Sequence, residues 1–432
     1  MEEQQGKITV IFGPNGSGKT QYVEQMRRQL ASDSVRYLAF SDAYGPATNK
    51  AYYLQLRWNQ HDIDQETPCI GTLLEKVYLQ SGVDNDEHRQ LRDHLYQLFG
   101  MQELLDKYVI LLSSGELRKF QLIKILLAYP KTLILDNPFI GLDVEARKQV
   151  SDLLQMIVRE HHIDLYLVIA KNDDIPDYTN RVIQMRVTEK KHFTQPDFQL
   201  LTPNHAPQPS ESDVVIDMRK VSIRYGERAI LSDLDWQVKR GERWALSGQN
   251  GSGKSTLLSL VCADNPQSYA CDITLFGQQR GSGESIWEIK KRIGYVSPEM
   301  HRSYLRDIPT IQVVASGLKD TVGLYIRPTE EEKVLCRRWL EVFGIKTLAD
   351  RSFITLSSGE QRLALVARAF VKNPDLLILD EPLHGLDDDN RQRVRHLIEA
   401  YCQQADKTLI MVTHYEEELP SCINRHLYLK RQ

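Results

Sequence analysis

The strongest constraint on how this chain of 432 residues can fold is a set of short motifs that occurs twice. The repeated motifs are Leu112–Glu116 and Leu356–Glu360, Leu133–Asp136 and Leu377–Asp380, and Gly141–Asp143 and Gly385–Asp387. Each pair is separated by 244 positions. Three separate motifs at one offset indicate an internal duplication, so we expect two similar domains.

Each half also contains the pattern G-x-x-x-x-G-K-[ST], at Gly13–Thr20 and at Gly248–Ser255. An apolar segment precedes each copy and an apolar helical pattern follows the second, as in a strand–loop–helix phosphate site. Backbone N–H groups and the helix dipole would hold phosphate there. A glycine-rich turn that binds nothing is the alternative, and the second copy argues against it.

The loops predict which residues surround nucleotide phosphates and Mg²⁺. Lys254 would reach the β- and γ-phosphates, and the Ser255 hydroxyl would ligate Mg²⁺. The predicted nucleotide-contacting residues are Gly13, Asn15, Gly16, Ser17, Gly18, Lys19 and Thr20 in the first half, and Gly248, Gln249, Asn250, Gly251, Ser252, Gly253, Lys254, Ser255 and Thr256 in the second.

Composition excludes several classes of protein. The chain is 41% hydrophobic, and its apolar runs are of strand length, too short to span a bilayer. The polar start of the sequence does not predict a signal peptide, and the six cysteines lack metal or disulfide-scaffold spacing, which favours a reducing, cytosolic setting. A net charge of −4 argues against a broad nucleic-acid-binding face.

The organisation along the chain is a first domain over 1–187, a polar, proline-rich linker over 188–213, and a second domain over 214–432. Strand patterns at 214–218, 221–225, 229–231 and 234–238 predict an additional sheet at the front of the second domain. The first domain has no room for this sheet because its phosphate loop begins at Gly13.

A pair of carboxylates follows the apolar run Leu376–Leu379, which is typical of a buried parallel strand. Asp380 is placed to hold Mg²⁺ and Glu381 to orient the attacking water. Two acids after a strand could instead form a solvated loop, but the phosphate loop upstream favours the nucleotide interpretation. In the first half Asp136 is the matching metal candidate, with Thr20, and Asn137 replaces the second acid.

The segment after Leu356 starts an amphipathic helix, and Ser357 could simply be its N-cap. With the phosphate loops, the Asp–Glu strand, the Gly-Leu-Asp loop and His414 after the next strand, however, the chain resembles an ATP-binding cassette ATPase. The resemblance implies two α/β P-loop cassettes with mostly parallel central sheets and helical inserts. In this family the Leu-Ser-x-Gly segment, here Leu112–Gly115 and Leu356–Gly359, is called the signature. The resemblance also implies that each ATP lies between one phosphate loop and the other cassette's signature.

The resemblance assigns further roles. His414 would contact the γ-phosphate, Tyr225 would stack on adenine, and Ser113 with Gly115 would close the second cassette's site. The other site would pair Lys19 and Asp136 with Ser357 and Gly359. We expect this other site to bind ATP but to hydrolyse it poorly, since Asn137 and Ala170 replace the acid and the histidine. The resemblance also implies a glutamine directly after the strand Ile293–Val296 and after its equivalent in the first half. Neither half has this glutamine, and the second half has Ser297-Pro-Glu299 at that place.

A closer resemblance, strongest over Asp272–Ser297, is to tandem-cassette proteins without membrane segments whose family name links them to molybdate transport. It implies a cytoplasmic or membrane-peripheral ATPase with separate transmembrane subunits as partners. The duplication itself predicts a monomer, because one chain supplies both cassettes of the pair. No residue indicates an oxyanion cargo. A soluble ATPase acting on nucleic acid or the ribosome is the alternative; such proteins usually carry a long charged helix between cassettes, which 188–213 does not resemble.

Overall fold

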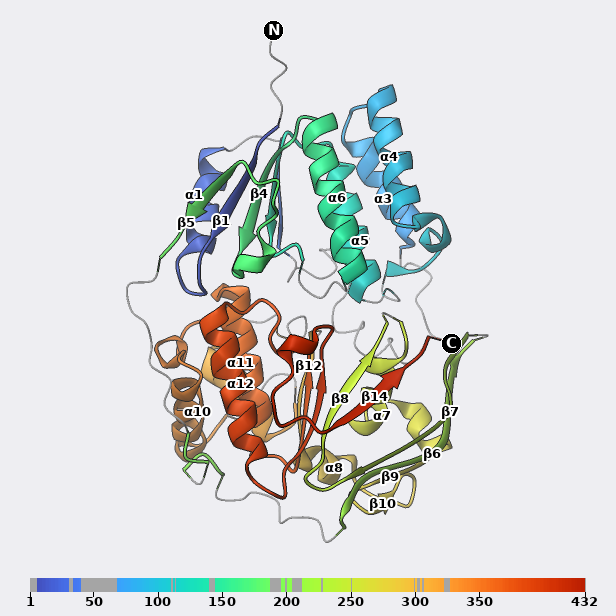
Figure 1. Cartoon of the computed structure of the whole chain (residues 1–432), viewed down its shortest axis with the longest axis vertical. Helices are drawn as coiled ribbons and strands as arrows, with labels where there is room; N and C mark the ends of the chain where they lie inside the picture. The colour runs from blue at the N-terminus through green and yellow to red at the C-terminus, as the bar shows by residue number, and fades with distance from the viewer. Residues whose placement is uncertain are drawn as a thin grey trace. The chain divides into compact units, whose positions relative to one another are not determined.

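The computed structural model describes residues 6–30, 34–39, 68–109, 112, 114–139, 144–186, 196–198, 200–203, 212–226, 228–249, 251–298, 300, 304, 307–321 and 327–431. The chain divides into two compact units, Met1–Val187 and Thr188–Gln432 (Figure 1). Each unit is an α/β domain built on a parallel sheet, and we describe each by itself.

The first unit contains a five-stranded sheet in the order β2-β3-β4-β1-β5, with every pair parallel. Its strands are β1 (Ile8–Phe12), β2 (Val35–Ala39), β3 (Thr132–Asp136), β4 (Asp164–Ile169) and β5 (Arg181–Gln184). Its helices are α1 (Lys19–Gln29), α3 (Ile70–Gln80), α4 (Asp86–Leu98), α5 (Ser114–Leu126) and α6 (Val144–Glu160). The apolar runs of β3 and β4 are buried because helices cover parallel sheets on both faces.

The second unit repeats this sheet in the order β11-β12-β13-β8-β14, again fully parallel. Its strands are β8 (Arg243–Gly248), β11 (Ile293–Val296), β12 (Leu376–Asp380), β13 (Thr408–Val412) and β14 (Arg425–Leu429). Its helices are α7 (Lys254–Val261), α8 (Ile286–Arg292), α9 (Thr310–Ala315), α10 (Glu330–Val342), α11 (Ser358–Phe370) and α12 (Asp388–Cys402). The two sheets match strand for strand, which confirms the predicted fold class.

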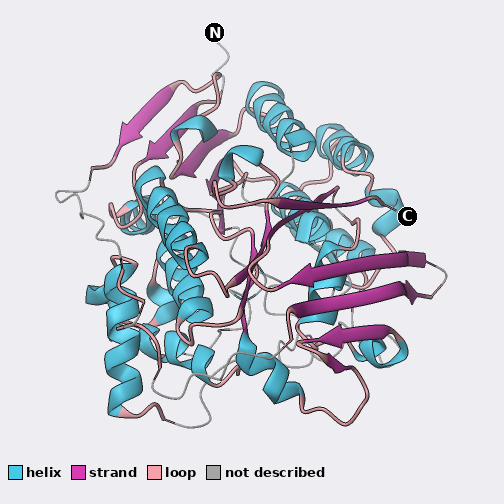
Figure 2. Cartoon of the chain, turned by 60° about the horizontal axis from the view of Figure 1, so that its bottom comes forward, coloured by secondary structure: helices cyan, strands magenta, loops and turns pink. Residues whose placement is uncertain are grey.

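A second, antiparallel sheet belongs to the second unit alone among the described residues, in the order β10-β9-β6-β7. Its strands are β6 (Val214–Tyr225), β7 (Arg228–Lys239), β9 (Asp272–Leu275) and β10 (Gln278–Gln279). Figure 2 shows the strands of both sheets as magenta arrows, with the long β6–β7 hairpin at the right. The four short strands expected at 214–218, 221–225, 229–231 and 234–238 are in fact two continuous strands, β6 and β7, whose pairing contains register shifts.

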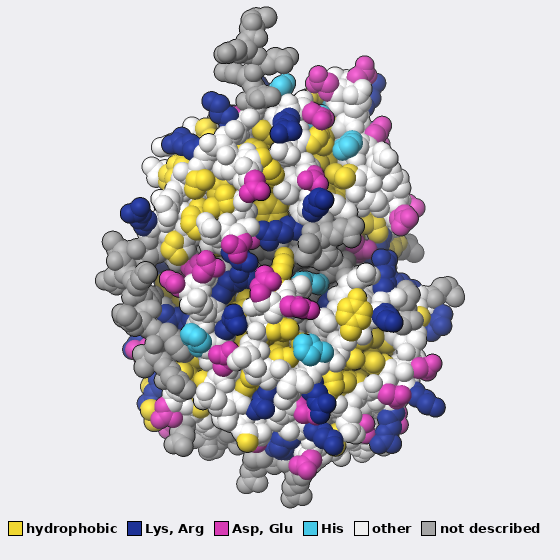
Figure 3. All heavy atoms as spheres, in the orientation of Figure 1, with side chains coloured by type: hydrophobic (Ala, Val, Ile, Leu, Met, Phe, Trp, Pro, Cys, Tyr) yellow, Lys and Arg dark blue, Asp and Glu magenta, His cyan; other side chains and the backbone are white. Residues whose placement is uncertain are grey.

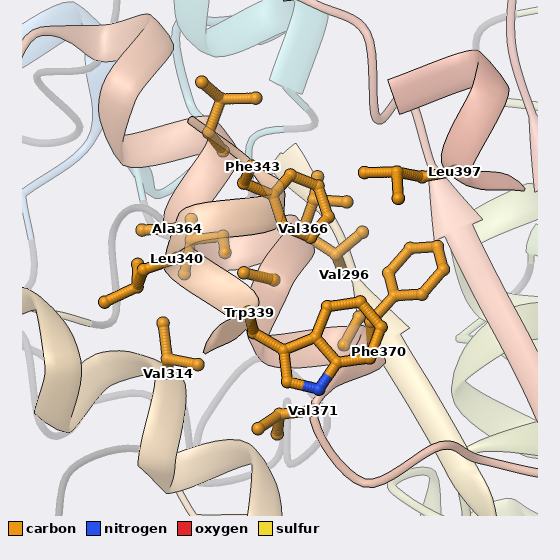
Figure 4. Close-up of a cluster of buried hydrophobic side chains, with 14 of the residues drawn as sticks. Val296, Val314, Trp339, Leu340, Phe343, Ala364, Val366, Phe370, Val371 and Leu397 are labelled. Carbon is orange, nitrogen blue, oxygen red and sulfur yellow. The ribbon is translucent and has the colours of Figure 1, made fainter. Parts of the chain in front are cut away.

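The largest core of the second unit lies between α9, α10, α11 and the sheet, where aromatic rings meet (Figure 4). Trp339 of α10 packs against Phe370 of α11 with ring centroids 5.5 Å apart, and Phe343 lies 5.9 Å from Phe370. Burying three large rings contributes several kcal/mol of hydrophobic stabilisation. This core fixes α11, the helix that carries the Ser357–Gly359 signature, against the strands.

Part of the segment expected to be a linker packs on this core. Leu201 is only 4% exposed, and its carbonyl accepts a hydrogen bond from the Trp339 indole Nε1 at 3.2 Å. Thr202 Oγ1 accepts one from Asn373 at 2.9 Å. Residues 196–203, where described, therefore belong physically to the second unit.

Two further expectations concern the membrane and the cysteines. No helix in the described part of the chain is both long and apolar enough to cross a bilayer. All six cysteines are described and all are free thiols: Cys262, Cys336 and Cys402 are buried, and the other three are half-buried.

Candidate functional site

The phosphate loop of the second unit has the backbone that phosphate binding requires. Gly251 and Gly253 adopt left-handed φ values of 78° and 95°, a region that residues with a Cβ avoid. A Cβ on Gly248 would lie 2.4 Å from the carbonyl oxygen of Leu429 and 2.7 Å from Ser252 Oγ. The glycines are thus required by the path of the loop as it enters α7. Asn250 lies outside the described residues.

Lys254 lies at the start of α7, and its Nζ donates to the carbonyls of Gly248 at 2.6 Å and Gln249 at 3.0 Å. Lys19 has the same arrangement in the first unit, bonded to the carbonyls of Gly13 and Pro14. In each unit the ammonium is therefore held across the mouth of its own loop. Gly16 and Gly18 repeat the left-handed φ values, at 76° and 85°.

A buried hydroxyl without a hydrogen-bond partner occurs once in each loop. Ser252 Oγ and the equivalent Ser17 Oγ are shielded from solvent and make no hydrogen bond to a described group. A buried hydroxyl normally has a partner, because leaving it unpaired costs about 1–3 kcal/mol. Together with the glycine backbone, these hydroxyls fit an oxyanion such as a nucleotide phosphate, and the predicted residues Asn15, Thr20, Ser255 and Thr256 lie in the same two segments.

The carboxylates lie where β12 ends, at the same edge of the sheet as the phosphate loop. β12, β13 and β8 are parallel neighbours, so the loops after Asp380, Val412 and Gly248 emerge together. Asp380 and Glu381 are both buried, and Glu381 adopts a left-handed φ of 51°. Its N–H donates to Val412 at 2.9 Å, which holds this turn against β13.

Two histidines contact the two oxygens of the Glu381 carboxylate. His414 Nε2 lies 3.0 Å from Oε1, and His384 Nδ1 lies 2.7 Å from Oε2. Burial alone would raise the pKa of Glu381, but the charges and close contacts of His384 and His414 outweigh it and hold that pKa well below the usual range. The carboxylate is thus kept ionised in a buried site. The predicted pair Glu381 and His414 is brought together; His384 was not predicted.

The first unit has the same backbone but different chemistry. Asn137 repeats the positive φ, at 53°, and its N–H donates to Val168 at 2.9 Å. Its amide donates to Asp136 at 2.8 Å, and Tyr37 donates to the other oxygen of that carboxylate at 3.3 Å. The position of His414 is occupied by the buried Ala170.

The two signature segments are described to different extents. In the second unit Ser357 caps α11 in a capping box: its hydroxyl accepts from the Glu360 N–H, and its own N–H donates to the Glu360 carboxylate at 2.9 Å. Gly359 is buried in the first turn. In the first unit Gly115 is the second residue of α5, while Ser113 lies outside the described residues. The contact of either signature with nucleotide remains a prediction.

Tyr225 ends β6 in the front sheet of the second unit. Its hydroxyl accepts a hydrogen bond from Asn265 Nδ2 at 3.0 Å, and Asn265 is itself buried just after α7. The ring is therefore oriented by the segment that follows the phosphate-loop helix. Stacking on adenine remains a prediction.

The strand that should lead to the missing glutamine, β11, is followed by Ser297. Its carbonyl accepts from Arg362 Nη1 of α11 at 3.3 Å. Burial lowers the pKa of Arg362 to about 10, and the negative charges of Glu381 and Asp380 oppose that shift. The sequence motifs did not predict a role for Arg362. A signal was present, because Arg118, which is also buried, lies at the matching position 244 residues earlier.

No group of three or more His, Cys, Asp or Glu side chains suited to a metal occurs among the described residues. The predicted Mg²⁺ ligands, Asp380 with Ser255 and Asp136 with Thr20, combine one carboxylate with one hydroxyl. Such a pair is completed by phosphate oxygens and water in nucleotide sites.

Comparison with known proteins agrees with this geometry. The family model described as "ABC transporter" matches residues 1–140 and 231–384. The chain is 42% identical to the ABC transporter ATP-binding protein ModF of Escherichia coli over 98% of this chain and 91% of that protein. An uncharacterized ABC transporter ATP-binding protein of Schizosaccharomyces pombe is 31% identical over 97% of this chain and 91% of its own length.

Among solved structures, a model of ribosome-bound archaeal Pelota and ABCE1 contains a chain that matches with a TM-score of 0.58 and 16% identity. The match covers 98% of this chain and 72% of that one. At this identity the likeness concerns the fold alone.

Proposed function

We propose, because this chain belongs to the ATP-binding cassette family of ATPases, that its second unit hydrolyses ATP and that the energy drives a separate membrane transport partner. The observation that carries this proposal is the meeting of three loops at one sheet edge, after β8, β12 and β13. They bring a phosphate loop, an Asp–Glu pair and His414 together.

In the proposed reaction, Lys254 and the loop N–H groups bind the β- and γ-phosphates, while Asp380 and Ser255 hold Mg²⁺. Glu381 accepts hydrogen bonds from the attacking water and orients it in line with the γ-phosphate. His414 already lies 3.0 Å from Glu381, so it can support that carboxylate and contact the phosphate. Binding, positioning and charge stabilisation supply the catalysis.

The first unit is proposed to bind ATP and to turn it over poorly. Asn137 carries a neutral amide, a poor proton acceptor, and it is bonded to Asp136. We further propose, on the family resemblance, that Ser113 and Gly115 complete the second unit's site and that Ser357 and Gly359 complete the first. Closure and opening of the pair would then be the mechanical output.

The transport role is supported by the relatives, which are named as ABC transporter ATP-binding proteins. The proposed location is the cytoplasm, at the inner face of the membrane where the partner subunits lie. Molybdate is the cargo that the sequence resemblance implies. A nucleic-acid or ribosome substrate is the second candidate, and basic and acidic side chains are interspersed on the face shown in Figure 3 rather than separated into a basic surface.

The deciding experiment is recovery of the full chain with its partners from native membranes and cytosol, with ATP and without. The Glu381→Gln variant should trap the ATP-bound form and increase the yield. Transmembrane subunits in the ATP-dependent fraction are the expected result. Ribosomes or nucleic acid in that fraction, with no membrane protein, would replace the transport proposal with the second candidate.

A further inference from the structure

His384 is a buried histidine in the turn that follows the catalytic strand. It is 7% exposed, and its backbone N–H donates to the Glu381 carbonyl at 3.3 Å, so residues 381–384 form one tight turn. Gly385 follows with a left-handed φ of 74°. This turn directs the imidazole back toward the carboxylate of Glu381.

The contact leaves the imidazole poorly satisfied by other groups. Nδ1 lies 2.7 Å from Glu381 Oε2, and no other described residue forms a hydrogen bond with either ring nitrogen. A buried imidazole retained only for packing would be an expensive choice, because a polar group without partners destabilises the fold. The proximity to one carboxylate oxygen is therefore the distinctive feature of this side chain.

The internal duplication provides an independent comparison. The positions 244 residues before Glu381, His384 and His414 are Asn137, Ile140 and Ala170. The unit that lacks the carboxylate thus lacks both histidines, although it retains the same strand order and the same positive φ at Asn137. Ile140 lies outside the described residues, so only its identity is used. The three side chains are present together or absent together.

We propose that His384 is a positioning residue for ATP hydrolysis, which holds one oxygen of the Glu381 carboxylate while His414 holds the other. A glutamate side chain has three rotatable bonds, and a general base must lie within hydrogen-bond reach of its water. Two imidazoles, one at each oxygen, remove that rotational freedom. The inference rests on the proposed function of Glu381 and adds a residue to it.

Steady-state hydrolysis by the full chain tests the inference with two substitutions. His384→Leu keeps the approximate volume and removes the ring nitrogens, whereas His384→Asn keeps an N–H group near the place of Nδ1. We expect His384→Leu to lower kcat by about tenfold to a hundredfold, the usual effect of losing an orienting partner, with KM for ATP changed by less than about twofold. His384→Asn should recover most of that loss.

A double-mutant cycle separates positioning from packing. If His384 acts through Glu381, the double variant of His384→Leu with Glu381→Gln should be no slower than Glu381→Gln alone. His426→Asn, at an exposed position on β14, is the matched histidine control and should keep full activity. Should His384→Leu fail to fold, His384→Met gives the same test, since its flexible thioether fills the space without donating.

The outcomes distinguish this inference from the proposed function. Full activity of His384→Leu beside an inactive Glu381→Gln would overturn the role of His384 and leave the site intact. An active Glu381→Gln would overturn the site itself. A loss in His384→Leu that adds to that of Glu381→Gln, or that His384→Asn does not relieve, would assign His384 to packing.

Discussion

At the scale of single residues, the two units differ where their backbones agree most closely. Glu381 and Asn137 both follow the strand aspartate, both have a positive φ, and both N–H groups bond to the next strand. Asparagine tolerates this conformation, while glutamate is held in it at a cost of roughly 1–2 kcal/mol. The second unit therefore keeps a strained glutamate at the site where a carboxylate is useful.

The first prediction is that Asn137→Glu does not create an active site. The new carboxylate would lack both histidine partners and would occupy a left-handed position, so we expect little added hydrolysis and a loss of about 1 kcal/mol in stability of the first unit. The measurement is ATPase activity in a Glu381→Gln background, where only the first site can report. Activity close to wild type there would contradict the expectation.

The second prediction concerns the adenine base. Tyr225→Ala should weaken ATP binding by about 1 kcal/mol, or roughly fivefold in Kd, because a stacking ring is lost. Tyr225→Phe is the matched control: it keeps the ring and removes only the bond from Asn265. Equal affinity in all three proteins, measured by titration with ATP, would show that the ring serves only the front sheet.

At the scale of elements, the expected linker contains a core residue. Leu201→Ala should destabilise the second unit by about 2–3 kcal/mol, since a buried leucine is truncated next to Trp339. The adjacent Leu200 is 62% exposed, so Leu200→Ala should change little. Denaturant unfolding followed by tryptophan fluorescence reports on this core. Equal midpoints for the two variants would indicate that 196–203 does not pack as described.

A pH prediction belongs to the end of α11, where Lys372 is buried beside Asp320 and donates to the Lys290 carbonyl at 2.6 Å. Burial lowers the pKa of Lys372 from 10.5 to about 8. Between these values the unfolded chain binds a proton that the folded chain does not, so the free energy of unfolding should rise with pH, by at most about 1.4 kcal/mol per pH unit.

Lys372→Met removes this titration. The difference in unfolding free energy between wild type and variant, measured by denaturant titration at intervals from pH 7.5 to 10.5, should therefore grow in favour of the wild type as pH rises. A difference that is constant over this interval would mean that Lys372 titrates normally in the folded protein.

The sequence predicted the elements that have strong patterns. Phosphate loops, apolar strands and the repeat offset led to the two parallel sheets, and the front sheet was expected from Val214 onward. The burial of Leu201 was not predicted, because a single leucine among prolines and polar residues shows no helical or strand periodicity. The packing of such a residue depends on a distant partner, here Trp339 of α10, which local patterns do not contain.

The contact of His384 with Glu381 was not predicted, for a related reason. A lone histidine after Pro382 and Leu383 has no metal spacing, and only the tight turn brings it back to Glu381. Comparison of the two halves at the fixed offset could have singled it out, because Ile140 stands in its place where the acid is lost. Arg362 shows the reverse case: Arg118 matches it, so the repeat marks it as a shared feature of both units.

At the scale of the whole molecule, the duplication predicts a functional monomer. If each ATP lies between the two units, as proposed, one chain of 49.8 kDa supplies both phosphate loops and both signatures, and no second copy would be needed to complete a site. Light scattering should give the mass of one chain with ATP and without it. A stable dimer in every nucleotide state would contradict this expectation.

The central claim is that the two units bind nucleotide with similar loops but that only the second hydrolyses it. Steady-state ATPase measurements on Lys254→Ala, Lys19→Ala and Glu381→Gln test it most directly, with ATP binding measured on the same preparations. We predict that Glu381→Gln nearly abolishes hydrolysis while still binding ATP, and that Lys254→Ala loses far more activity than Lys19→Ala. Equal losses in the two lysine variants, with Glu381→Gln still active, would contradict the account.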